Sequence, residues 1–142
     1  MLAVGLVSIA VGTAYYLLAG NPPRIDPANA KQVEQGRRLY VAACASCHGA
    51  SLEGQPNWQR RLPNGRLPAP PHDATGHTWH HSDEFLMRIT RFGPAAYPEG
   101  YRTDMPAFGD TLSDGEIAAI LAYIKSHWPP DIRARQTRQN VR

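Results

Sequence analysis

Residues 49–81 carry no hydrophobic period, and this stretch constrains the fold of the 142-residue chain more than any other feature. Most of it reads "GQPNWQRRLPNGRLPAPPHDATGH", in which glycine, proline and asparagine favour turns and loops throughout. Connections longer than about 15 residues without regular structure are uncommon in compact domains, so this loop needs something to wrap around. We therefore expect it to surround a cofactor.

The sequence "CASCHG" stands just before this loop and holds the only two cysteines, Cys44 and Cys47, with His48 directly after them. A disulfide in so tight a loop leaves the histidine unexplained. A thioredoxin-like redox pair needs a βαβ context, which the sequence lacks, and a zinc site normally needs four ligands. Covalent haem attachment explains all three residues, because both thiols can reach one porphyrin edge while His48 faces the iron.

Three helices are expected in the region of residues 27–130, with no strand signal and no internal repeat. The first covers residues 27–43 with Asp26 as its cap, the second begins near Ser82 and ends at Gly93, and the third runs from a capping-box pattern at Ser113 and Glu116 to about His127. The predicted fold class is therefore all-α, as one small domain with two long loops.

Two stretches resemble class I c-type cytochromes: "GRRLYVAACASCHG", residues 36–49, and "TDMPAFGDTLSDGEIAAILAYI", residues 103–124. The resemblance covers about residues 27–128 and implies three main helices with long haem-wrapping loops, in which Gly36 lets the first and third helices cross closely. It also implies one covalent haem c, with attachment at Cys44 and Cys47, His48 and Met105 as axial iron ligands, and the carbonyl of Pro70 or Pro71 bonded to the proximal histidine.

The second axial ligand has rivals in the sequence. Of the other methionines, Met1 lies in an apolar segment and Met87 lies among core residues of a helix, whereas Met105 lies in a loop stiffened by Pro106. Four histidines are crowded within ten residues and could instead ligate the iron or bind copper or zinc: His72, His77, His80 and His81. Trp58 and Trp79 are further candidates for lining a haem pocket.

Both ends of the chain differ in composition from the middle. Residues 1–20 contain no charged side chain, and twenty helical residues span about 30 Å, so we expect an uncleaved transmembrane anchor rather than a signal segment. Residues 21–26 then form a Pro-rich tether. Residues 131–142 contain four arginines and one aspartate, which accounts for the formal net charge of +3, and are expected to be a basic flexible tail.

The predicted function is electron transfer, without enzymatic turnover, by a membrane-tethered carrier or a cytochrome c subunit of a respiratory complex. Expected partners are a cytochrome bc complex and a terminal oxidase, with no nucleic acid and no small-molecule substrate. The expected location is the bacterial inner membrane, single-pass, with the haem domain on the periplasmic side. Two alternatives stay open: a haem enzyme subunit or ligand sensor with an open sixth position, and a copper-handling module built on the histidines of residues 72–81.

Overall fold

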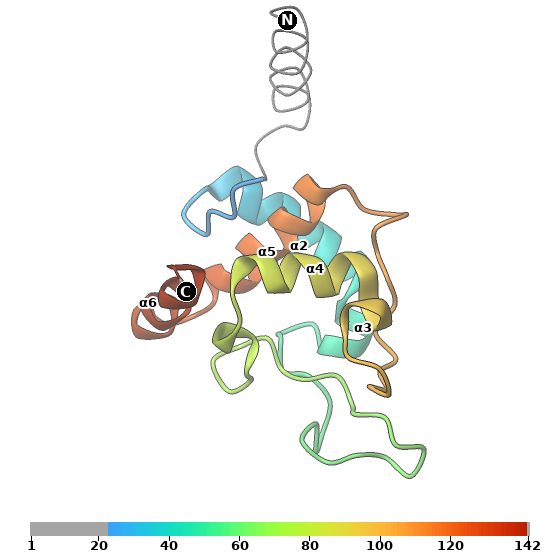
Figure 1. Ribbon diagram of the computed structural model, residues 1–142. Coiled ribbons are helices and arrows are strands. Elements are labelled where there is room, and N and C mark those ends of the chain that lie inside the picture. The colour runs from blue at the N-terminus through green and yellow to red at the C-terminus, as the bar shows by residue number, and fades with distance from the viewer. Residues whose placement is uncertain (1–22, 142) are drawn as a thin grey trace, which may run out of the picture.

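The computed structural model describes residues 23–141, and within them the chain is helical and contains no strand (Figure 1). In chain order the elements are α2 (Ala30–Ala43), α3 (Ala45–His48), η1 (Thr78–His80), α4 (Asp83–Phe92), η2 (Gly93–Ala96), α5 (Asp114–Ser126), α6 (Pro130–Thr137) and η3 (Arg138–Val141). Only the short η1 interrupts the long connection between α3 and α4, as the aperiodic sequence of this stretch predicts.

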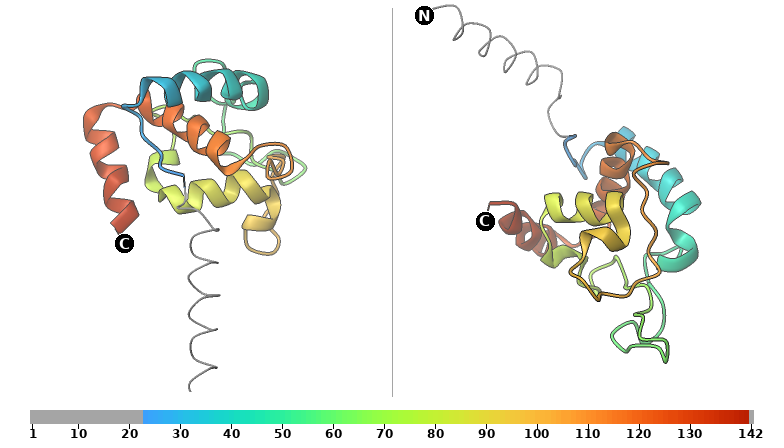
Figure 2. Two further views of the ribbon diagram at one scale, coloured as in Figure 1. Left: turned by 90° about the horizontal axis from the view of Figure 1, so that it is seen from above. Right: turned by 45° about the vertical axis from the view of Figure 1, so that its right-hand side comes forward.

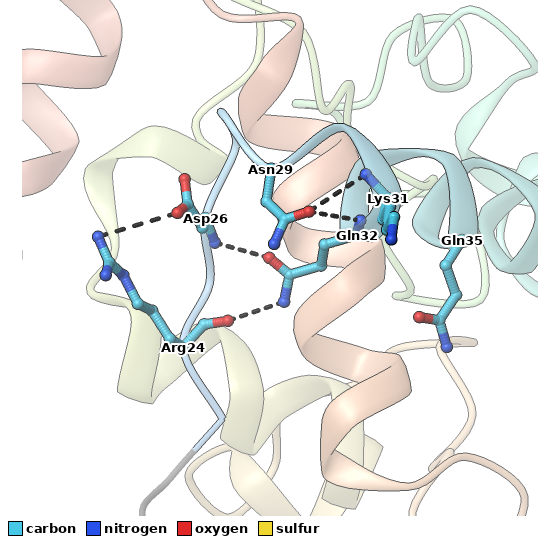
Figure 3. Close-up of a pocket in the computed structure, with 6 residues that line it drawn as sticks. All are labelled: Arg24, Asp26, Asn29, Lys31, Gln32 and Gln35. Carbon is cyan, nitrogen blue, oxygen red and sulfur yellow. Dashed lines mark hydrogen bonds and ion pairs between the residues drawn. The ribbon is translucent and has the colours of Figure 1, made fainter.

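The helix α2 begins later than its sequence suggests. The side chain of Asn29 accepts hydrogen bonds from the backbone N–H groups of Lys31 and Gln32, at 3.1 and 3.2 Å, and is the N-cap. Asp26, the predicted cap, instead accepts from the N–H of Ala28 at 3.0 Å. Gln32 then folds back to bond the backbone of Asp26 and Arg24 (Figure 3), which ties the incoming chain to the first turn of α2.

The helices α2 and α5 cross at Gly36, and this crossing is the centre of the core (Figure 1). A Cβ added at Gly36 would lie 1.9 Å from the carbonyl oxygen of Ala119, so only glycine fits. Tyr40 is fully buried next to the crossing, with its ring 5.3 Å from that of Tyr123. Its hydroxyl donates to the carbonyl of Gly49 at 2.8 Å, which anchors the cysteine turn to the core.

Local capping explains where α4 and α5 begin. Ser82 accepts a hydrogen bond from the N–H of Phe85 at 3.2 Å. Ser113 and Glu116 form the reciprocal capping box that the sequence predicts, which satisfies two backbone donors that the helix leaves unpaired. The two helices pack against each other, and the second face of α5 packs on α2 (Figure 2).

The predicted fold class of three main helices preceded by one N-terminal transmembrane helix is wrong. The described part of the chain has five α-helices rather than three. Across residues 23–141, no helix combines the length and the apolar character that crossing a membrane requires. The predicted anchor, residues 1–20, lies outside the described residues.

Most of the segment predicted to be a flexible basic tail, residues 131–142, is folded. Residues 130–137 form α6, in which Ile132 is buried and Gln136 has no exposed surface. The carboxylate of Asp83, at the start of α4, accepts from Lys125 Nζ at 2.8 and 2.9 Å, from Gln136 Nε2 at 2.6 Å and from Asn140 Nδ2 at 3.0 Å. This network joins α4, α5 and the C-terminal segment, and the charge pattern of the tail gives no sign of it.

Candidate cofactor site

A cavity of about 810 Å³ lies between the cysteine turn, the long loop, α4, α5 and the loop that follows η2. Its wall contains most of the residues that the sequence singles out: Cys44, Cys47, His48, Pro70 and Met105. Pro71 does not line it. The volume falls within the range of about 300–1,000 Å³ that is usual for ligand and cofactor sites.

The two cysteines are presented by the turn between α2 and α3. Cys44 is the C-cap that directly follows α2, and its N–H donates to the carbonyl of Tyr40 at 2.8 Å. The N–H groups of Cys47 and His48 then bond back to the carbonyl of Cys44, at 3.1 and 2.9 Å, which closes one helical turn. Burial raises the pKa of the Cys44 thiol to about 11, with a smaller effect from Cys47. Two sulfurs therefore lie one turn apart in the lining of the cavity.

The imidazole of His48 is buried and held in one orientation. Its Nδ1 lies 2.9 Å from the carbonyl oxygen of Pro70. Because a carbonyl can only accept, Nδ1 carries the proton and Nε2 keeps its lone pair, which is the state of a histidine that ligates a metal. Burial lowers the pKa of His48, although the bond to Pro70 opposes this effect. Of the two prolines that the sequence suggests for this contact, Pro70 makes it.

The loop that carries Met105 is pinned to the end of α4. The N–H groups of Phe108 and Gly109 donate to the carbonyls of Thr90 and Arg91, at 3.1 and 2.9 Å. Gly93 ends α4 with φ of 52°, and a Cβ there would lie 2.6 Å from the backbone N of Ala107. Glycine at this position therefore allows the loop to pass close to the helix, which places the Met105 thioether in the cavity wall.

Met87, the rival methionine, packs against the hydrophobic core and does not line the cavity. Of the four crowded histidines, His72, His77 and His81 line the cavity and His80 does not. Within residues 23–141, no three histidine, cysteine or acidic side chains gather closely enough to hold a metal ion. The alternative of a copper or zinc site in residues 72–81 therefore gains no support from this part of the chain.

Several aromatic residues line the cavity wall; the sequence singles out Trp58 among them but gives little sign of Tyr97 and Tyr101. Trp58 stacks on His77 with ring centroids 5.2 Å apart, and Tyr97 stacks on Tyr101 at 4.1 Å. All four line the cavity, whereas Trp79 does not. These residues lie in irregular segments, where no periodicity marks a buried face. Only the presence of large aromatic side chains in a loop hinted at their role.

The donor set of this cavity fits a haem. Two thiols and an imidazole with a free Nε2 come from one turn, a thioether comes from a separate loop, and the helices contribute apolar side chains: Phe85, Leu86, Ile89, Ile120, Leu121 and Ile124. Thiols attach the porphyrin, imidazole and thioether are iron ligands, and apolar surface covers the macrocycle.

The family model described as cytochrome C oxidase, cbb3-type, subunit III matches residues 31–124. That span begins in α2 and ends in α5, so it contains the cysteine turn, the Met105 loop and the whole cavity wall described above. Neither the curated proteins nor the solved structures contain a match to the chain. The chain belongs to the family of cbb3-type cytochrome c oxidase subunit III and is a monohaem c-type cytochrome that binds haem c covalently.

Proposed function

We propose that this cytochrome passes single electrons to a terminal oxidase, with His48 and Met105 as the two axial ligands of its haem iron. The observation that carries the proposal is the shared cavity. Residues from the cysteine turn and from the loop after η2, far apart in the sequence, contribute an imidazole and a thioether to the lining of the same cavity. When bound, haem iron supplies a one-electron couple, which neither side chain possesses alone.

The protein side of the site supplies orientation and a dry environment. The bond from His48 Nδ1 to the Pro70 carbonyl makes the imidazole a stronger donor at Nε2 and fixes its tautomer. The thioether of Met105 is a soft ligand that favours the reduced metal, so histidine and methionine together raise the reduction potential relative to two nitrogen ligands. The apolar side chains of α4 and α5 exclude water from the same space.

Optical spectra of the matured protein, oxidised and reduced, test this ligation. We expect a low-spin spectrum with a methionine-to-iron charge-transfer band in the parent. Met105→Ala should lose that band and lower the reduction potential. Met87→Leu is the matched control, because Met87 packs in the core outside the cavity, and its spectrum should equal that of the parent.

A Met105→Ala protein that keeps the band and the potential would contradict the proposed ligation and move the ligand to another side chain. Ready binding of carbon monoxide by the ferrous parent would instead favour an open sixth position, as in a haem enzyme subunit or a ligand sensor. Whether the cytochrome is a fixed subunit or a mobile carrier is tested by purification with the native oxidase. A subunit is expected to stay at a constant ratio to oxidase haem through successive columns, and a carrier is expected to be lost.

A further inference from the structure

The imidazole of His72 lies flat against the imidazole of His48. Their ring centroids are 4.0 Å apart and the ring planes differ by 21°. The other close aromatic neighbour of His72 is Tyr40, which meets it edge-on, with centroids 6.3 Å apart and planes at 72°. The face of the proposed iron ligand is therefore covered by a second planar ring.

His72 is itself held at three points. Its Nδ1 lies 2.8 Å from the hydroxyl of Thr78, a buried residue of η1. Its backbone N–H donates to the carbonyl of Leu52 at 2.8 Å, and its carbonyl accepts from the indole N–H of Trp128 at 2.7 Å. A residue whose ring, backbone N–H and carbonyl all form hydrogen bonds has little freedom to turn, so the flat face of its ring is a rigid surface.

The hydrogen bond between His48 and Pro70 does not fix the plane of the His48 ring. Hydrogen bonds to carbonyl oxygens tolerate a broad range of directions, so this bond fixes the tautomer of His48 more firmly than the plane of its ring. A parallel ring at 4.0 Å restricts that plane directly, because rotation of His48 would drive its edge into His72. The orientation of the ring plane of an imidazole that ligates haem iron decides which iron d orbitals the ring overlaps. It therefore affects the reduction potential of the iron.

We propose that His72 is a positioning residue that sets the ring plane of His48 by stacking against it. This inference rests on the proposed ligation of the iron by His48. It gives His72 a role other than that of a rival ligand, and it assigns to Trp128, which lies beyond the segment that matches the family, the task of holding His72 in place.

The test compares four variants of the haem-loaded protein by ferric electron paramagnetic resonance and by reduction potential. His72→Phe keeps a planar ring, and His72→Leu fills similar space without one. Thr78→Val leaves His72 in place but removes the hydroxyl that orients its ring. His80→Leu is the matched control, because His80 is exposed and lies outside the cavity wall.

We expect His80→Leu to keep a single low-spin signal with the g values of the parent. His72→Leu should shift the g values or split the signal, and should shift the reduction potential in the same experiment. His72→Phe and Thr78→Val both keep a planar ring at position 72 but lose its bond to the Thr78 hydroxyl, so each should deviate from the parent by less than His72→Leu. Parent-like spectra and potentials in His72→Leu would overturn the inference, as would a His72→Phe or Thr78→Val protein that behaves like His72→Leu. A parent without a nitrogen-ligated low-spin signal would overturn the proposed ligation and the inference together, which distinguishes the two failures.

Discussion

Replacement of Gly36 by alanine should destabilise the protein although alanine favours helices. Helix propensity alone would stabilise the folded state by about 1 kcal/mol. The new Cβ would lie 1.9 Å from the oxygen and 2.5 Å from the carbon of the Ala119 carbonyl, and 2.9 Å from the Cβ of Tyr123. Backbone atoms cannot rotate away, so α2 and α5 would have to separate by more than 1 Å to reach the 3.0 Å that real Cβ contacts require.

That separation has two consequences for the free energy of unfolding. Overpacking of a core typically costs about 1–3 kcal/mol, and a gap of about 0.5–1 Å along the rest of the helix contact forfeits a quarter to a half of the dispersion energy there. The contact is with backbone, which calls for the upper end of that range, so after the gain in helix propensity is subtracted we expect Gly36→Ala to lower the free energy of unfolding by about 2 kcal/mol.

Urea unfolding of the haem-loaded protein, followed by far-UV circular dichroism, measures this difference. Gly115→Ala is the matched control, because Gly115 is an exposed residue of α5 and a Cβ there meets nothing within 4 Å. It should raise the free energy of unfolding by about 0.5–1 kcal/mol. If Gly36→Ala were as stable as the parent, or more stable, the close approach of α2 to α5 would be refuted.

Two further predictions concern charged side chains. Asp83→Ala should lower the free energy of unfolding by about 3–5 kcal/mol, because it leaves the buried ammonium of Lys125 without its partner. In the same urea titration, Asp114→Asn at the exposed pair with Arg91 should lower it by less than about 1 kcal/mol. The backbone and side-chain hydrogen bonds of Ser113 lower the pKa of Glu116, so its contribution to stability is present above pH 4.5 and is lost as the pH falls through the lowered pKa. Thermal melts from pH 6 to pH 3 should therefore fall more steeply for the parent than for Glu116→Gln, and equal slopes would contradict the capping role.

Local signals in the sequence were sufficient for α4 and α5, since Ser82 and the Ser113–Glu116 pair act on backbone groups within four residues. The start of α2 was harder to predict because Asp26 and Asn29 are both good caps, and tertiary contacts of Gln32 decide between them. The spacing of the two cysteines and the histidine predicts the cysteine turn directly, because covalent haem attachment depends on a local sequence motif.

Residues whose role depends on the path of the long loop could not be predicted in the same way. The sequence groups His72 with its neighbours as a rival metal ligand, because nothing in it shows that the ring of His72 faces His48. The sequence gives no sign of the folded C-terminal segment for a related reason. Its polar residues include Gln136, which is buried only because it meets Asp83, more than fifty positions earlier in the chain.

The carboxylate network around Asp83 also bears on where this domain should be cut in the laboratory. Trimming the chain at residue 124, where the match to the family ends, would delete Lys125, Gln136 and Asn140. The Asp83 carboxylate at the N-terminus of α4 would then lose these three hydrogen-bond donors. Trp128 would be lost with them, leaving the carbonyl of His72 without its donor. The unit that folds is thus longer than the segment that matches the family. Expression boundaries drawn at the end of that match would remove the C-terminal segment that bonds to Asp83 and His72.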